Sequence, residues 1–281
     1  MIFILVKARN VNIILLAGII ISTFLIYNQS VKFEFTNLDD HLQVVENHDI
    51  RSFNPDHIGK IFSSQYVGMY QPLTTIFYAL EYAIFGLNSG GYHLVSMIFH
   101  LLNIILVFWF VRLLLKDQKK AIMVTALFAL HPLSAEAVCW ISARSTLTYA
   151  FFYLLSLIMY LKYKDQKKNI LYIFSILFFV LSVFSKAMAV TLPVILLLLD
   201  YYRGERFSVK LILQKIPYFL ISFAFGLIAL MIRENVGDLN STNYYFGFFE
   251  RLMISIYQID WYIFMSVLPF DLSAYYPDPE K

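Results

Sequence analysis

The stretch ILYIFSILFFVLSVFSKAMAVTLPVILLLL, residues 170–199, decides the fold of this chain. It contains a single charged side chain, Lys186. A membrane-crossing helix needs about 20 apolar residues, so this run is too long for one crossing with a modest tilt. We therefore predict two helices, 169–185 and 187–202, that form a tight hairpin turning at Lys186. The alternative is a single tilted span with a buried lysine.

Similar apolar runs recur along all 281 residues, of which 59% are hydrophobic and 15% are charged. A water-soluble domain of this composition would expose far too much apolar surface, so the bilayer is the expected solvent. The first run is expected to be an uncleaved span rather than a signal peptide, because no small-x-small cleavage site follows Tyr27. The sequence predicts an all-α, polytopic membrane protein that forms one membrane domain, 1–281, with about eight spans: 10–27, 93–115, 121–138, 146–162, 169–185, 187–202, 216–233 and 252–269.

Lysine and arginine gather in four short segments beside the predicted spans: 7–9, 112–120, 162–168 and 203–215. With alternating spans all four fall on one side, which the positive-inside rule makes cytoplasmic together with the N-terminus. The net charge is only +3 and the cations form these topology signals, so no nucleic-acid partner is expected. The opposite, extracytoplasmic side receives 28–91, 139–145, the turn at Lys186 and 234–250.

The segment 28–91 is the largest predicted loop and carries the adjacent pair Asp39 and Asp40 close to the first span. Its second half, 70–87, mixes aromatic and aliphatic residues as expected of a helix lying along the membrane interface. Two adjacent carboxylates can share a proton, bind a cation or deprotonate an attacking hydroxyl. Because neighbours in sequence point in different directions, only one of the pair is expected to face a site. A turn or helix cap at 37–40 is the alternative.

Polar residues also gather near the outer end of the predicted span 121–138, around Pro132. Glu136 and Arg144 are spaced to share a helical face, and charges at membrane depth are costly unless they are paired or functional. A guanidinium suits phosphate through its rigid fork of donors, so Arg144 is a candidate to bind an anionic lipid headgroup; a structural Glu136–Arg144 pair is the alternative. Lys186 is a second candidate to bind the phosphate. The alternative is a lysine at the end of a span whose ammonium group reaches toward the membrane interface.

The remaining polar positions give weaker signals. His93 and His100 share a face of the second predicted span, but two histidines without a nearby carboxylate make a poor metal site, so we expect polar packing and assign no metal. The single cysteine, Cys139, excludes an intramolecular disulfide and a cysteine-based zinc site. Asp260 lies inside the last predicted span, where an acid is a functional candidate.

Short motifs along residues 30–205 occur in an order that is far more specific than any one of them. They are Leu38-Asp39-Asp40 with Asn47-His48-Asp49, Tyr70-Gln71-Pro72-Leu73-Thr74, Phe85-Gly86-Leu87-Asn88 with Gly91-Tyr92-His93-Leu94, His100, His131-Pro132-Leu133 with Glu136, Val138, Trp140-Ile141 and Arg144, Ser185-Lys186 with Val190-Thr191-Leu192-Pro193, and Leu199-Asp200-Tyr201. In this order they resemble the membrane part of the transmembrane-and-tetratricopeptide-repeat O-mannosyltransferases. Leu272-Ser273 with Tyr275-Tyr276-Pro277 is also similar to that family.

The resemblance implies an inverting membrane glycosyltransferase of the GT-C type. Such an enzyme moves a hexose, here mannose, from a polyprenyl-phosphate lipid to a hydroxyl on the extracytoplasmic face, with a protein serine or threonine or a glycan as acceptor. The resemblance places the catalytic base at Asp39 or Asp40, with Asp39 favoured. It assigns the donor phosphate to Arg144 and Lys186, with Glu136, His131 and His93 in support. Membrane lipid is a further partner, no cofactor beyond the lipid-linked sugar is implied, and a divalent metal is left open.

Two features depart from the family pattern. Gln71 stands where the family usually has arginine, and the tetratricopeptide repeats and later spans are missing, so a C-terminal truncation, a split gene product or a degenerate member is expected. A bias toward Ile, Phe, Tyr and Lys is typical of an AT-rich genome, which suggests a bacterial inner membrane; the endoplasmic-reticulum membrane is the eukaryotic equivalent. A non-catalytic transporter or assembly subunit is the alternative to an enzyme, although transporters place ionisable residues near the bilayer midplane.

Overall fold

The computed structural model describes residues 2–206, 208–235, 247–270 and 272–273, and the regular elements within these ranges are all helices. The principal helices are α1 (Ile2–Tyr27), α3 (Pro72–Phe85), α4 (Ser89–Leu115), α5 (Gln118–Leu130), α7 (Arg144–Gln166), α8 (Asn169–Ser185), α9 (Leu192–Tyr202), α11 (Ile216–Asn235) and α13 (Phe248–Val267). Shorter elements are η1 (Asn28–Lys32), η2 (His41–Val45), η3 (His48–Arg51), α2 (Pro55–Ser63), α6 (Ser134–Cys139), η4 (Ile141–Ala143), η5 (Ala187–Thr191) and α10 (Val209–Leu213). The predicted all-α class is confirmed.

Apolar helices run through most of the chain. Three described segments are long and apolar enough to cross a membrane, and they match the predicted spans 10–27, 93–115 and 146–162: Asn12–Lys32, Ser89–Leu115 and Ile141–Gln166. Three shorter apolar segments match 169–185, 187–202 and 216–233: Asn169–Ser185, Ala187–Tyr202 and Ile216–Ile232. Length and composition therefore fit a helical membrane protein, whereas the number of crossings stays a prediction.

The predicted span 121–138 needs correction, because α5 ends at Leu130 and the separate helix α6 starts at Ser134. His131 between them is extended, with φ −69° and ψ 128°, which is the conformation that a following proline favours. At about 1.5 Å per residue α5 extends over ~20 Å, which is less than the ~30 Å of the hydrocarbon core. Residues 121–138 are thus two helices, and α5 alone is short for a crossing.

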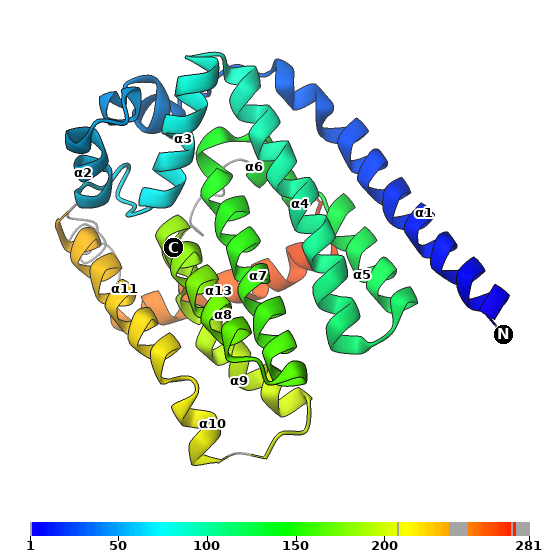
Figure 1. Cartoon of the computed structure of the whole chain (residues 1–281). Coiled ribbons are helices and arrows are strands. Elements are labelled where there is room, and N and C mark those ends of the chain that lie inside the picture. Colours follow the sequence, from blue (N-terminus) through cyan, green and yellow to red (C-terminus); the bar gives the residue numbers. More distant parts are fainter. Residues whose placement is uncertain (1, 207, 236–246, 271, 274–281) are drawn as a thin grey trace.

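The predicted span 252–269 is a helix, α13, but it is not among the described helices whose length and composition suit a crossing, so the crossing itself stays a prediction. In Figure 1 it runs across the other helices instead of alongside them, and Met265 is its one buried residue. Asp260 lies exposed on this helix, so it is not an acid enclosed in the bundle.

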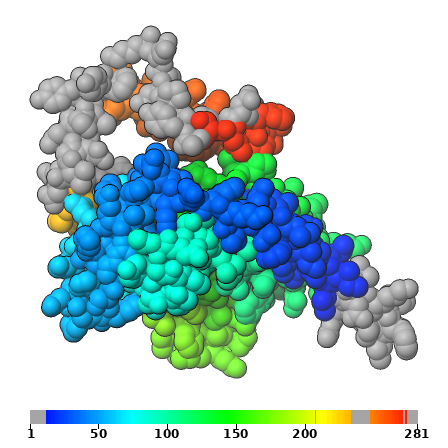
Figure 2. Space-filling model, turned by 90° about the horizontal axis from the view of Figure 1, so that it is seen from above, coloured from blue at the N-terminus to red at the C-terminus, as the bar shows by residue number. Residues whose placement is uncertain are grey.

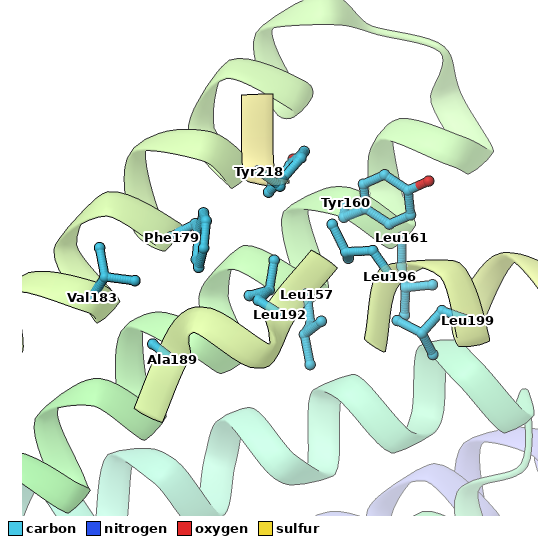
Figure 3. Packing of buried hydrophobic residues seen from close by; sticks show 10 residues of the cluster. All are labelled: Leu157, Tyr160, Leu161, Phe179, Val183, Ala189, Leu192, Leu196, Leu199 and Tyr218. Carbon is cyan, nitrogen blue, oxygen red and sulfur yellow. The ribbon is translucent and has the colours of Figure 1, made fainter. Parts of the chain in front are cut away.

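The apolar run 170–199 breaks at Lys186 as predicted. Its backbone is extended there, with φ −160° and ψ 135°, so α8 ends at Ser185 and the chain continues through η5 into α9. Side chains of α7, α8, η5, α9 and α11 share one apolar cluster, drawn in Figure 3: Leu157, Tyr160, Leu161, Phe179, Val183, Ala189, Leu192, Leu196, Leu199 and Tyr218. Val183 and Ala189 lie at one end of the cluster and Leu199 at the other, as expected of arms that run in opposite directions. A single tilted span is therefore excluded.

The connections between the helices separate into two ends. The α4–α5, α7–α8 and α9–α10 connections, which contain the basic segments 112–120, 162–168 and 203–215, lie at the lower end of Figure 1. The elements of 28–91 lie at the upper end. Charged links and the first large loop thus occupy opposite ends of the molecule, which is the arrangement that alternating spans require.

The segment 28–91 forms a folded cap over the upper end of the bundle. Figure 2 looks down on this end, where its blue-to-cyan surface covers much of the face while α1 projects at its side. One buried cluster joins the cap to the helices below: Val44, Ile50, Ile61, Tyr78, Ala79, Tyr92 and Ile141. α3 confirms the helix predicted over 70–87, and it exposes Leu80 and Ile84 on its outer side. Its position at a membrane interface remains a prediction.

A glycine at the start of α4 is required by the close approach of the cap. A Cβ added at Gly90 would lie 2.7 Å from the backbone carbonyl oxygen of Val31. We expect Gly90→Ala to lower the free energy of unfolding by ~1–3 kcal/mol, because the backbone of η1 must move. Thermal unfolding of the purified chain in detergent checks this. Gly18→Ala is the matched control, since nothing lies within 4 Å of its added Cβ, and equal effects of the two changes would contradict the prediction.

Candidate functional site

Asp40 ties the cap to the connection between α6 and α7. The side chain is fully buried, and its Oδ2 accepts hydrogen bonds from the backbone N–H and the hydroxyl of Thr36, each at 2.9 Å. Its Oδ1 accepts from the backbone N–H of Ser142 at 2.8 Å and from its hydroxyl at 2.5 Å. Both oxygens are occupied, so Asp40 is suited to hold Asp39 and the surrounding loop in position.

Asp39 differs from its neighbour in having an available carboxylate. It is half-buried and accepts no hydrogen bond from the described residues. Burial, and secondarily the charge of Asp40, raises the pKa of Asp39. A carboxylate without fixed donors and with a raised pKa is a better proton acceptor than Asp40. That Asp39 faces a catalytic site stays a prediction.

Arg144 is enclosed by protein. The side chain is 0% exposed; its Nη1 pairs with Glu81, its Nη2 donates to the Tyr92 carbonyl at 2.6 Å, and its Nε donates to the Ser96 hydroxyl at 3.0 Å. The guanidinium also lies 5.1 Å from the ring centre of Tyr78. Each of the three guanidinium nitrogens thus donates to a protein group, and the side chain is fully buried, so this conformation does not present Arg144 to a phosphate.

The partner of Arg144 corrects one sequence expectation. The sequence predicts, as the alternative to phosphate binding, that Arg144 pairs with Glu136. The acid that Arg144 contacts is instead Glu81 of α3. Glu136 is exposed in the first turn of α6. The one signal that could have identified Glu81 is its place as the sole acid in the apolar helix α3. An acid on a buried helical face requires a cation nearby.

Lys186 lies at the end of α8 and faces the start of α7. Its ammonium group donates to the hydroxyl of Thr146 at 2.8 Å. Burial lowers the pKa of Lys186, and the nearby charge of Glu136 opposes this shift. Lys186 has no ion pair within 4 Å among the described residues, so its charge is less compensated than that of Arg144.

Asp40 and Lys186 both contact the start of α7. Ser142 holds Asp40 and Thr146 holds Lys186, and these two residues are four positions apart where η4 enters α7. One helical turn advances by about 5.4 Å, so the two anchor points are close in space. The structure therefore brings Asp40 and Lys186, more than a hundred positions apart in sequence, onto the upper end of one helix.

The two supporting histidines lie in different environments. The His131 Nε2 is 3.1 Å from the Ser266 carbonyl oxygen, so this side chain contacts the end of α13. His93 is fully buried at the start of α4, where its ring meets Phe33 edge-on at 6.0 Å. Within the described residues no group of three or more His, Cys, Asp or Glu side chains could hold a metal ion.

A cavity opens beside the cap. It has a volume of about 380 Å³ and is lined by Ser63, Ser64, Gln65, Tyr70 and Ile232. The ring of Tyr70 lies 6.4 Å from that of Phe184, which precedes Lys186 by two residues. Polar hydroxyl and amide groups thus line a hollow at the same end of the molecule as Asp39.

Known proteins resemble part of this chain. It is 28% identical over 144 residues to protein O-mannosyl-transferase TMTC3 of Homo sapiens, which is 48% of this chain and 15% of that protein. Protein O-mannosyl-transferase TMTC2 of Homo sapiens is 39% identical over 94 residues, or 34% of this chain and 11% of that protein. Protein O-mannosyl-transferase Tmtc1 of Drosophila melanogaster is 31% identical over 162 residues, or 55% of this chain and 18% of that protein.

The resemblance that the order of the motifs predicts is therefore confirmed, and it covers about a third to a half of this chain. The chain spans less than a fifth of the length of these curated relatives. No family model and no solved structure matches it.

Proposed function

We propose that this chain, being similar to protein O-mannosyl-transferases, is a membrane glycosyltransferase. In this proposal it moves mannose from a polyprenyl-phosphate lipid to a serine or threonine hydroxyl of a protein. The reaction occurs at the end formed by the cap, on the extracytoplasmic side of a bacterial inner membrane or of the endoplasmic-reticulum membrane. The observation that carries the proposal is that Asp40, the neighbour of Asp39, and Lys186 both contact the start of α7.

Asp39 acts as the general base in the proposed reaction. Its carboxylate accepts the proton of the acceptor hydroxyl while the hydroxyl oxygen attacks C1 of the sugar. The new C1–O bond forms on the face opposite the leaving group, so the configuration inverts. A base of this kind needs a free lone pair and a position near the attacking oxygen, and Asp39 has the first of these where Asp40 does not.

Lys186 neutralises the leaving group. As the bond from C1 to the donor phosphate breaks, both electrons stay on the phosphate oxygen and the polyprenyl phosphate leaves as an anion. The donor phosphodiester already carries one negative charge, and the leaving polyprenyl phosphate gains a second; a fixed cation stabilises this developing dianion more strongly than the singly charged ground state. We assign this role to Lys186 instead of Arg144, because Arg144 is fully buried and each of its guanidinium nitrogens already donates to a protein group.

The reaction itself is tested with the full chain reconstituted in lipid vesicles. Mannosyl polyprenyl phosphate and a serine- or threonine-containing peptide are supplied, and mannosyl peptide is measured by mass spectrometry. Vesicles without protein are the control. Absence of both peptide mannosylation and donor consumption by a chain that unfolds cooperatively would overturn the proposal.

Lys186→Met is expected to lower kcat by ~10²–10³-fold, the effect of removing one fixed charge from a developing anion. Lys186→Arg should retain part of the rate because it keeps the charge. Loss of activity should also begin at a lower alkaline pH than an ordinary lysine would give, because burial lowers the pKa of Lys186. Initial rates across pH check this.

Lys119→Gln is the matched control for Lys186, since it removes an exposed lysine at the opposite end of the molecule. Unchanged transfer by Lys186→Met, in protein that folds as the wild type does, would exclude the assigned role.

A further inference from the structure

The lower end of the molecule contains a buried ionic cluster that the proposed reaction does not use. Asp200 of α9 is paired with Lys215 at 2.6 Å and with Lys164 at 3.4 Å, and the Tyr160 hydroxyl donates to both of its oxygens at 2.9 and 2.7 Å. Lys164 also pairs with Glu205. The cluster joins α7, α9 and the start of α11, and it balances two lysines against two acids.

This cluster and one nearby ion pair involve every acid of the basic segments 162–168 and 203–215. Arg203 pairs with Asp165, which is the only acid of 162–168, and Glu205 is the only acid of 203–215. Four exposed cations remain without an acidic partner in the described residues: Lys167, Lys168, Arg206 and Lys210. The surface around the α7–α8 connection and α10 is therefore positive without local compensation.

A groove of about 520 Å³ opens between the start of α8 and α10, within this positive surface. Lys210, Asn169 and Gln214 give it a polar side, and the exposed side chains of Ile173 and Leu213 give it an apolar side. Tyr163 and Tyr172 complete its lining. The first turn of α8 has neither a capping side chain nor an acid, and although the N–H of Leu171 donates to the Lys168 carbonyl, the positive dipole end of the helix lies uncompensated beside Asn169.

We propose that this groove binds the headgroup of an anionic phospholipid from the leaflet on the side of the basic links. Lys210 and Lys168 contact the lipid phosphate, and the N-terminus of α8 contributes its N–H groups. The acyl chains lie along Ile173 and Leu213. The apolar side of the groove selects a lipid over free phosphate, and the excess of cations selects an anionic lipid over a zwitterionic one.

Native mass spectrometry of the full chain in detergent tests this site, with phosphatidylglycerol or phosphatidylcholine added. We expect phosphatidylglycerol to remain bound in preference to phosphatidylcholine. Lys210→Gln should weaken this binding about fivefold, and Lys168→Gln with Lys210→Gln further, since each lysine near an anionic lipid surface contributes a factor of this size. Lys119→Gln removes the same charge from a different basic segment, 112–120, and should leave binding unchanged.

Three outcomes would overturn the proposal. These are equal binding of the two lipids, equal weakening by Lys119→Gln and Lys210→Gln, and displacement of the lipid by inorganic phosphate, which would identify a free anion as the occupant. The measurement needs no sugar donor, so its result is independent of the proposed transferase activity.

Discussion

Asp39→Asn should reduce mannosyl transfer by ~10²–10⁴-fold, the usual contribution of a general base, without lowering the unfolding temperature. Asparagine keeps the size of the side chain but cannot accept the proton of the attacking hydroxyl. The side chain accepts no hydrogen bond from the described residues, so its replacement removes no contact that holds the cap. Initial rates with mannosyl polyprenyl phosphate, together with thermal unfolding of the same preparation, check both parts.

The pH dependence provides a second measure of the same role. The pKa of Asp39 is raised by burial, so the acid limb of the rate profile should lie above the ordinary aspartate value of about 4. Transfer should increase as pH rises through this pKa, because the base must be ionised. The stability of the fold depends on pH in the opposite direction. A raised pKa in the folded state favours the protonated carboxyl, so the contribution of Asp39 to the free energy of unfolding is lost as pH rises through this pKa. Asp39→Asn should therefore not destabilise the protein at neutral pH.

Asp40→Asn is the control that separates the two carboxylates. Asparagine has one acceptor oxygen where Asp40 uses two, so the donors of Thr36 or of Ser142 lose their partner. We expect a lower unfolding temperature and, through the displaced loop, a slower reaction. If Asp40→Asn abolished transfer at unchanged stability while Asp39→Asn remained active, the base would be Asp40.

The sequence predicts the helices better than it predicts their partners. Hydropathy locates α4 and α7, and the lone charge of Lys186 locates the break between α8 and α9, because both depend on local composition. Hydropathy misplaces the span 121–138, because the apolar run continues past Pro132 whereas helix α5 ends at Leu130, before the proline. α13 is found as a helix, whereas its role as a span stays a prediction.

The candidate site is harder to predict because it is made of contacts between distant segments. Asp39, Asp40 and Lys186 can be selected from the sequence as charges at the outer ends of helices. Nothing in the sequence indicates that Ser142 holds one member of the 39–40 pair, and although Glu81 stands out as the sole acid of α3, no pattern assigns it to Arg144. Such pairs are set by how the cap folds onto α7, which a one-dimensional pattern does not contain.

Arg144→Ala should destabilise the protein by ~3–5 kcal/mol, the typical cost of leaving one member of a buried ion pair without its partner. Glu81 is 3% exposed and would keep its carboxylate in the interior with no cation beside it. Tyr92 and Ser96 would also lose a donor. Thermal or denaturant unfolding of the purified chain measures the loss.

The double replacement Arg144→Met with Glu81→Leu distinguishes a structural role from a phosphate-binding one. Replacing both members of a buried pair with apolar residues of similar volume removes the unpaired charge, so much of the stability lost in Arg144→Ala should return. If Arg144 only holds the fold, transfer returns together with stability. If Arg144 binds the donor phosphate in another conformation, transfer stays low in a protein whose stability has recovered. We expect the first result, because every nitrogen of the guanidinium is already bonded to a protein group and release to a ligand would strand Glu81 in the interior.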